Sequence, residues 1–240
     1  YNYTVRDGLP SNTIAAVEVD KDGMIWVGSM SGLSKFDGKN FRHFMLQSPE
    51  DPAGNSVNRI KMGSDGTTWC LSGGKVYSVK NDRTQRLSTP ADDEKCTALL
   101  PEARTLWLAT KGMLWRYEGQ RWDSLMPEGI APQNRLVITD IFRDSRKRLL
   151  VTTSHGLFQV DNRRIVPVTV KERTLDNVPG IISITEDKSG AIWLGLTSGV
   201  LRITDTSLYF FNKKNGLSDN GFPSLLTDME GNVWMASDGQ

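Results

Sequence analysis

Few side chains in this sequence have the chemistry that catalysis or metal binding requires. The 240 residues include two histidines, His43 and His155, and two cysteines, Cys70 and Cys96. Neither pair is spaced as zinc ligands are, and no nucleophile and base form a recognisable pattern. The acidic stretch 20–23 is similar to part of a calcium loop, but such a loop needs a distal glutamate, so we predict a hairpin turn there. The sequence thus predicts no catalytic residue, no metal site and no cofactor.

A site that binds a polar ligand has four better candidates, Lys111, His155, Arg59 and Arg135. Lys111 and His155 each follow a run of apolar or β-branched residues. Arg59 and Arg135 lie near the starts of other such runs. Whether the four basic side chains share one face of the molecule depends on the elements that carry them.

A repeat carries these residues. A tryptophan recurs at positions 26, 69, 107, 193 and 234, and Leu150 occupies the same register between the third and the fourth. Successive positions of this anchor are 38 to 43 residues apart. Other columns keep an apolar residue, as nine residues before the anchor: Val17, Ile60, Ala98, Ile141, Ile184 and Leu225. We expect this column to be buried, because a repeat unit buries its apolar face against its neighbours.

Each repeat unit is predicted to consist of strands. β-branched residues precede the anchor, and a turn such as Asp20–Gly23 leads into the anchor strand. A third and a fourth strand follow, joined by a turn such as Asp37–Gly38. No unit shows a helical period. Four strands in about 42 residues predict an all-β fold, a β-propeller of four-stranded blades.

The ends of the chain affect the expected domain organisation. We expect a single β-propeller over residues 1–240, with an outer strand in residues 1–7. The expected blades cover approximately residues 8–50, 51–92, 93–131, 132–174, 175–216 and 217–240. This gives five complete blades plus partial blades at both ends. A ring that closes imperfectly and a fragment of a longer propeller both fit this pattern, and the end inside a unit favours the fragment.

One unit carries a recognisable motif. Residues 8–41 contain Gly8-Leu-Pro-Ser-Asn12, then Asp20-x-x-Gly and Ile25-Trp-Val-Gly28, and parts of this pattern recur at 190–200 and 216–220. The unit resembles the two-component regulator propeller repeat. The resemblance implies the periplasmic or extracellular sensor part of a membrane-anchored hybrid histidine kinase. It also implies that the segment does no chemistry itself, that an oligosaccharide is its ligand, and that a kinase lies downstream.

Composition limits the other classes of function. The formal net charge is +1, which argues against a general nucleic-acid binder. No stretch approaches the roughly 18 apolar residues of a membrane span. An interaction or dimerisation scaffold remains an alternative, with a second copy or a neighbouring propeller as the partner. A propeller lyase or glycosidase is a further alternative, although the aspartate of sialidase repeats, five residues before the anchor, is absent.

In a propeller, the loops after the second strands and the connections between blades share one end and commonly bind ligands. That end would carry Lys111 and His155, together with Arg59 and Arg135, and a polar or anionic oligosaccharide would suit these side chains. Asparagines recur before the first strands, at Asn12, Asn55, Asn134, Asn177 and Asn220, where we expect them to fix the backbone.

Three further features have plain structural explanations. Trp115 and Trp122 lie outside the anchor column, and we expect Trp115 to face away from the core and Trp122 to lie on an outer strand. The basic run 143–148 is predicted to be a solvated turn. Cys70 and Cys96 are expected to be buried free thiols, although neighbouring blades could bring them together.

Overall fold

The chain is built almost entirely of β-strands. The computed structural model describes residues 2–46, 55–90, 92–126, 137–219, 221 and 224–237. The helical elements named within these ranges are two short 3-10 turns, η1 (Val5–Asp7) and η4 (Lys213–Asn215), and Asn55 also has a 3-10 conformation. No helix of the described residues is long and apolar enough to cross a membrane. The predicted all-β class is confirmed.

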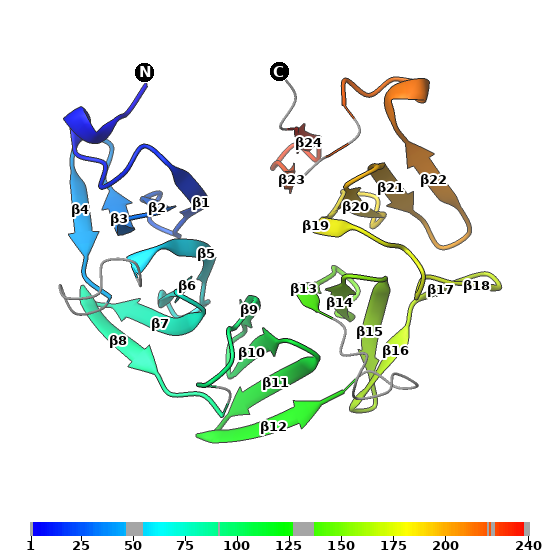
Figure 1. The fold of residues 1–240 in the computed structure, drawn as a ribbon, viewed down its shortest axis with the longest axis horizontal. Coiled ribbons are helices and arrows are strands. Elements are labelled where there is room, and N and C mark those ends of the chain that lie inside the picture. The colour runs from blue at the N-terminus through cyan, green and yellow to red at the C-terminus, as the bar shows by residue number, and fades with distance from the viewer. Residues whose placement is uncertain are drawn as a thin grey trace. The chain divides into compact units, whose positions relative to one another are not determined.

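Twenty strands form five antiparallel sheets of four, and each sheet is one blade (Figure 1). Blade one contains β1 (Ile14–Val19), β2 (Ile25–Ser29), β3 (Gly32–Phe36) and β4 (Phe41–Phe44), and blade two contains β5 (Val57–Met62), β6 (Thr68–Ser72), β7 (Lys75–Lys80) and β8 (Arg83–Leu87). Blade three contains β9 (Ala98–Pro101), β10 (Thr105–Thr110), β11 (Met113–Glu118) and β12 (Arg121–Leu125). Blade four contains β13 (Ile138–Arg143), β14 (Leu149–Thr153), β15 (Leu157–Asp161) and β16 (Arg164–Pro167), and blade five contains β19 (Ile181–Glu186), β20 (Ile192–Leu196), β21 (Gly199–Ile203) and β22 (Leu208–Phe211). In each blade the strands pair in chain order, so the fold is the predicted β-propeller fold.

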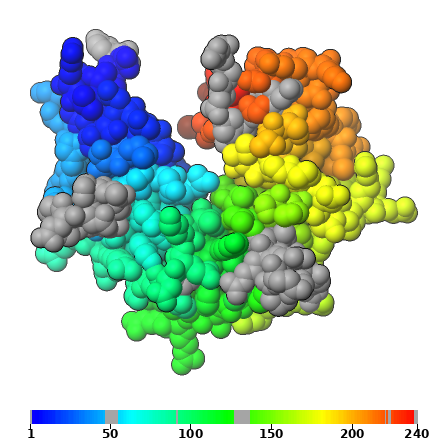
Figure 2. Space-filling view, viewed as in Figure 1, coloured from blue at the N-terminus to red at the C-terminus, as the bar shows by residue number. Residues whose placement is uncertain are grey.

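Two hairpins complete the described strands. β17 (Thr169–Val170) and β18 (Arg173–Thr174) form a short hairpin between blades four and five, and Figure 2 shows it standing out from the surface in yellow-green. β23 (Ser224–Thr227) and β24 (Val233–Ala236) form a two-stranded sheet after blade five. Sequence periodicity predicted the second hairpin as part of a sixth unit, but it gave no sign of the first.

The strands divide into two compact units. The first unit comprises residues 1–110 and 115–123, and the second comprises residues 111–114 and 124–240. In the first unit β1 packs on β5, and β5 packs on β9. In the second unit β13 packs on β19, and β19 packs on β23. Within each unit, therefore, the first strand of one blade lies against the first strand of the next.

The predicted buried column is confirmed at most of its positions. Ile60, Ala98, Ile141 and Ile184 are between 0% and 7% exposed. Val17 is 58% exposed, so the expectation was wrong there. Its side chain lies on the face of blade one that points away from blade two, and no described strand of the first unit covers that face. Within each unit the column is buried where a preceding blade packs against it, as at Ile60 and Ile184.

The anchor tryptophans follow the same rule. Trp26 is 4% exposed and packs with Val57 and Ile60 of blade two in one core cluster. Trp234 is 62% exposed, because it lies on the face of β23–β24 opposite the one that packs on blade five through Leu225. Trp26 is thus core because the following blade of the same unit covers it.

The N-terminal segment does not form the expected outer strand. Thr4 instead caps η1, because its hydroxyl accepts a bond from the Arg6 amide while Asp7 bonds back to Thr4. The side chain of Asn12 accepts a bond from the Val5 amide at 2.9 Å. Asn12 therefore fixes the backbone before blade one, as predicted for the asparagine column. The ring of Tyr3 packs edge-on against Phe36, with 4.9 Å between centroids.

Of the remaining expectations for single side chains, some are confirmed and one is wrong. Trp115 packs against the apolar cluster between blades two and three, so its expected outward orientation was wrong. Trp122 packs against the same cluster and lies on the outer strand β12, as expected. Cys70 and Cys96 are buried and free, as expected. Burial raises the pKa of the Cys70 thiol to about 12 and that of Cys96 to about 11. Neither thiol is therefore a reactive thiolate at neutral pH.

Candidate functional site

The acidic turn before the anchor strand bonds the anchor tryptophan in blades one and five and in the β23–β24 hairpin. In blade one, Asp20 Oδ1 accepts bonds from the amides of Asp22 and Met24, both at 3.0 Å. Asp20 Oδ2 accepts a bond from the indole nitrogen of Trp26 at 2.9 Å. Asp187 binds Trp193 in the same way at 2.8 Å, and Asp228 binds Trp234 at 2.7 Å. The predicted hairpin turn at residues 20–23 is confirmed, and its carboxylate fastens the turn to the anchor.

A basic side chain completes this arrangement in two blades. The ammonium of Lys35 lies 3.0 Å from Asp20 Oδ2 and 5.1 Å from the centre of the Trp26 ring. In blade five Arg202 lies over Trp193 in the same manner, with 5.5 Å to the ring centre. Each group contacts both the carboxylate and the aromatic face, which combines an ion pair with a cation–π contact.

These contacts lower the pKa values of the turn carboxylates. Partial burial works to raise the pKa of Asp20, but the bonds from Trp26, Lys35 and two backbone amides outweigh it, and the pKa lies below its usual value. Burial also opposes the shift at Asp187. Bonds from Ser189, Trp193 and backbone amides nevertheless hold the pKa of Asp187 at about 2. Both groups are therefore carboxylates at any physiological pH.

Blade four lacks the tryptophan and uses a different donor. Leu150 occupies the anchor position, and Asp144 keeps the turn. Arg148 donates from Nε to Asp144 Oδ2 at 2.6 Å, and the side chain of Asp144 is fully buried. A guanidinium thus replaces the indole as the partner of the carboxylate. The sequence contained a signal for this exchange, since the only basic residue two positions before an anchor stands in the unit whose anchor is not aromatic.

The basic run 143–148 does more than form a solvated turn. Ser145 donates from its amide and from its hydroxyl to the two carboxylate oxygens of Glu186, each at 2.7 Å. Arg146 forms an ion pair with Asp205. Glu186 and Asp205 belong to blade five, so the run joins two blades of the second unit, and the predicted solvated turn was wrong in this respect.

Two of the four predicted ligand residues are brought together at one end of the second unit. Lys111 forms an isolated bridge with Val137, and the carbonyl of Val137 accepts a bond from the Ser154 amide at 2.8 Å. His155 follows Ser154, and both Lys111 and His155 are exposed. A cation and an imidazole therefore lie in neighbouring loops with their side chains open to solvent.

Hydrogen bonds with Thr153 and Val178 fix the backbone of the loop that carries His155. Thr153 Oγ1 accepts bonds from the amides of His155 and Gly156, at 3.2 and 3.0 Å. The carbonyl of His155 accepts a bond from the Val178 amide at 2.6 Å. A Cβ on Gly156 would lie 2.3 Å from the Leu175 carbonyl oxygen, so only glycine fits at this position. The imidazole is thus presented from a fixed backbone, and its Nδ1 lies 2.8 Å from Ser154 Oγ.

The other two predicted residues have different outcomes. Arg59 is half-buried on β5, directly after a shift in register between Val57 and Arg59. Its Nε is buried and has no hydrogen-bond partner among the described residues, and its Nη1 donates to the Asn58 carbonyl at 3.4 Å. Arg135 lies outside the described residues. A ligand role for any of the four residues stays a prediction.

Sequence reasoning missed the spaces between blades, at the end that carries the acidic turns. A cleft of about 430 Å³ lies between blades one and two and is lined mainly by polar groups, including Asp20, Lys35 and Asp65. A smaller cavity of about 100 Å³ lies between blades four and five and is lined by aliphatic side chains of both blades and by polar groups that include Arg148 and Asp205. Neither space includes Lys111, His155 or Arg59.

Comparison with known proteins begins with the repeat. The family model described as two component regulator propeller matches residues 8–31. The first repeat unit is therefore similar to the two-component regulator propeller repeat. A stretch of 50 residues is 42% identical to the histidine kinase P4 of Formosa agariphila. The stretch covers 21% of this chain and 4% of that protein. The likeness to the kinase is therefore confined to a small part of its length.

Solved structures confirm the propeller fold of the chain. The extracellular domains of two B. thetaiotaomicron proteins described as hybrid two component systems match 97% and 100% of the chain, with TM-scores of 0.62 and 0.60 and identities of 18% and 16%. The chain spans 38% and 40% of those domains. Virginiamycin B lyase from Staphylococcus aureus matches 93% of this chain and 77% of its own, with a TM-score of 0.72 and 13% identity. At these identities the likeness shows the propeller fold alone.

Proposed function

We propose that the chain is the ligand-sensing propeller of a two-component sensor, located in the periplasm or outside the cell. The observation that carries this proposal is the regulator propeller repeat at residues 8–31, in a chain that shares 42% identity over 50 residues with a histidine kinase. The extracellular domains of described hybrid systems that share the fold support the location. In this proposal the segment itself is not an enzyme, and a kinase elsewhere in the protein receives the signal.

The proposed ligand is a polar or anionic oligosaccharide bound at the loop end of the blades. Exposed basic groups in neighbouring loops, Lys111 and His155, suit sugar hydroxyls and acidic sugars, because they donate hydrogen bonds from a fixed backbone. Arg135 and Arg59 are further candidates. A ligand at this end would contact loops from several blades, and it could therefore change how the blades pack.

Isothermal titration calorimetry with neutral and anionic oligosaccharides tests this proposal on the complete sensor region. We expect Lys111→Ala and His155→Ala each to weaken binding at least fivefold, whereas Lys171→Ala, at an exposed turn of the β17–β18 hairpin, leaves affinity unchanged. Unchanged affinity in both loop variants would retire this end as the binding site. Turnover of the sugar would contradict a purely sensory role.

An interaction scaffold is a second candidate, and exposed apolar side chains favour it. Val17 and Val19 are 58% and 57% exposed on β1, and Leu226 and Trp234 are 63% and 62% exposed on the β23–β24 hairpin. Sheet faces of this kind pack against other sheets elsewhere in each unit. Sedimentation velocity separates the two candidates, because a scaffold would self-associate through these faces without any sugar, and Val17→Asp would abolish the association.

A further inference from the structure

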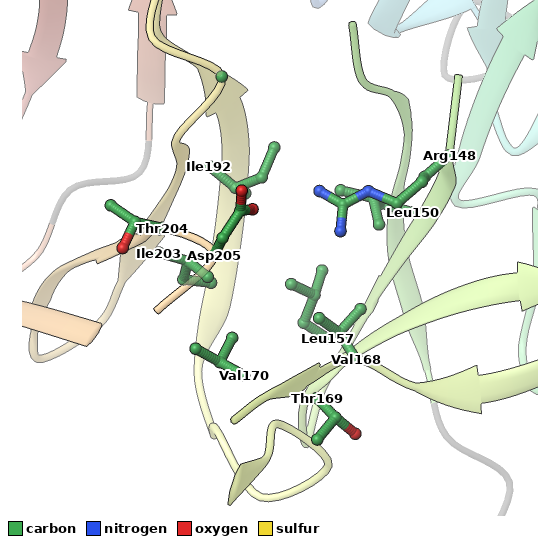
Figure 3. A pocket seen from close by; sticks show the side chains of 11 residues that line it. Arg148, Leu150, Leu157, Val168, Thr169, Val170, Ile192, Ile203, Thr204 and Asp205 are labelled. Atoms are coloured by element: carbon green, nitrogen blue, oxygen red, sulfur yellow. The ribbon is translucent and has the colours of Figure 1, made fainter. Parts of the chain in front are cut away.

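The cavity between blades four and five has a distinctive lining. Leu150, Leu157, Val168, Val170, Ile192 and Ile203 form its apolar walls, and Arg148, Thr204 and Asp205 stand at its polar side. Figure 3 shows the blade-four side chains facing those of blade five across the space, with Arg148 directed toward Asp205. All of these residues belong to the second unit.

The cavity occupies the place of an aromatic pair that other blades contain. In blade one Trp26 stacks on Phe44, with 5.1 Å between ring centroids. In blade five Trp193 stacks on Phe211, with 5.8 Å between centroids. The positions that correspond to this pair in blade four hold Leu150 and Val168.

Backbone register establishes that correspondence. Phe44 pairs with Leu33 across β3 and β4, and Phe211 pairs with Val200 across β21 and β22. Val168 donates from its amide to the Leu157 carbonyl at 3.0 Å, which places it opposite the residue equivalent to Leu33 and Val200. Two aliphatic side chains therefore stand where two stacked rings stand in the neighbouring blade, and the volume that remains is the cavity of about 100 Å³.

We propose that this cavity binds a single aromatic ring that carries a neutral hydroxyl group, a ligand of the phenol class. An apolar cavity of about 150 Å³ is known to stay dry and to hold benzene. The smaller space here opens toward Arg148 and Asp205, so part of a ring can remain in the mouth. The ring would take the place of the missing indole between Leu150 and Ile192.

The polar side of the cavity selects the substituent. The guanidinium of Arg148 donates hydrogen bonds, and the carboxylate of Asp205 accepts them, so a hydroxyl group can accept from the first and donate to the second. Arg148 is already paired with Asp144, so a carboxylate on the ring would gain little from it and would be repelled by Asp205. Asp205 is already paired with Arg146, so an ammonium group would gain little from it and would be repelled by Arg148. The cavity lies at the acidic-turn end of the blades, away from the loops of Lys111 and His155, so this proposal does not depend on the proposed sensory function.

Ligand-observed NMR with phenol, benzene and benzoate tests the proposal on the intact chain. We expect phenol to give saturation transfer and to bind more tightly than benzene, with benzoate at least tenfold weaker than phenol. Leu150→Trp refills the cavity and should abolish the phenol signal, whereas Leu150→Met keeps the side-chain volume similar and should retain it. Circular dichroism establishes that each variant is folded.

A second variant keeps the test decisive if Leu150→Trp fails to fold. Val168→Phe adds a ring from the other half of the missing pair and should reduce phenol affinity at least tenfold. Two results would overturn the proposal: no binding of phenol to the folded wild-type chain, or equal binding of phenol by the wild type and by a folded refilled variant. Equal affinities for phenol and benzoate would overturn the assigned role of Asp205.

Discussion

Blades four and five are neighbours in the second unit, yet they hold the same acidic turn in different ways. In blade five the turn carboxylate of Asp187 binds the indole of Trp193, and Arg202 covers the ring. In blade four the carboxylate of Asp144 binds Arg148, and the anchor is Leu150. In these two blades the turn carboxylate has a side-chain donor, and either an indole or a guanidinium supplies it. The aromatic stack is a separable addition, and its absence leaves a cavity.

The largest effect should follow from forcing an aromatic blade to resemble blade four. We expect Trp26→Leu to lower the free energy of unfolding by about 3 kcal/mol, because it removes a buried ring from its contact with Phe44 and leaves Asp20 without its indole donor. Urea denaturation measures this change. The exposed Trp234→Leu is the matched control and should cost well under half as much, since its ring is 62% exposed.

A compensating substitution sharpens the same comparison. Met24 occupies the position in blade one that Arg148 occupies in blade four. Adding Met24→Arg to Trp26→Leu should recover about 1 kcal/mol, because the guanidinium restores a charged donor to Asp20. If the double variant is no more stable than Trp26→Leu, the exchange of donors between blades is not transferable.

The converse break removes the substitute donor. Arg148→Ala leaves the fully buried carboxylate of Asp144 without its side-chain partner, and we expect a loss of about 2 kcal/mol. That value is below the range for a fully buried pair because the Arg148 side chain is 36% exposed. Thermal and urea denaturation should agree on the loss. Arg173→Ala, at an exposed position on β18, serves as the control and should change stability by less than about 0.5 kcal/mol.

The sequence predicted the parts of this comparison that depend on periodicity. The anchor column, the acidic turn and the four-stranded unit all recur at fixed offsets. Because repeat units pack against one another, residues at the same offset take equivalent places in successive blades. The exposure of Val17 and Trp234 could not be predicted, because burial depends on the blade next to a residue rather than on the residue itself. The register shifts in the first strands, such as that between Val57 and Arg59, also escaped prediction, since a one-residue bulge has no signature in composition.

The candidate site was predicted less completely. Lys111 and His155 were expected at one end because both follow a second strand, and the structure places their loops together. The link between them runs through Val137, whose backbone bonds both loops, and backbone bonding of this kind leaves no trace in residue type. The sequence shows that leucine replaces tryptophan at position 150, but it does not show that this replacement leaves a cavity. Its consequence depends on Val168, which lies opposite Leu157 only after the blade has folded.

Acid should weaken blade five through its turn carboxylate. The pKa of Asp187 is about 2 in the folded chain, against an ordinary value of 3.8, so its contribution to stability is complete above about pH 4 and is lost as the pH falls through 2. The difference corresponds to about 2 kcal/mol. We expect Asp187→Asn to flatten the decrease in unfolding free energy between pH 4 and pH 2, measured by urea denaturation at each pH. Asp161→Asn, at an exposed position, should leave the profile unaltered, and a wild-type slope in Asp187→Asn would contradict the assignment.

The smallest expected effect concerns the cation that covers the anchor ring. Gln159 of blade four occupies the position that Arg202 occupies in blade five, so Arg202→Gln makes blade five resemble its neighbour at this one point. Arg202 Nε lies 3.3 Å from Asp187 Oδ2, and the guanidinium lies 5.5 Å from the centre of the Trp193 ring. Because the side chain is 27% exposed, we expect a loss of only about 0.5 to 1 kcal/mol in the free energy of unfolding.

Arg202→Lys keeps the cation, as Lys35 does in blade one, and should retain most of that stability in urea denaturation. Since part of the interaction is an ion pair near solvent, the difference between the Gln and Lys variants should shrink in 1 M salt. Equal losses in the two variants would mean that the packing of the arginine stem, rather than its charge, stabilises blade five.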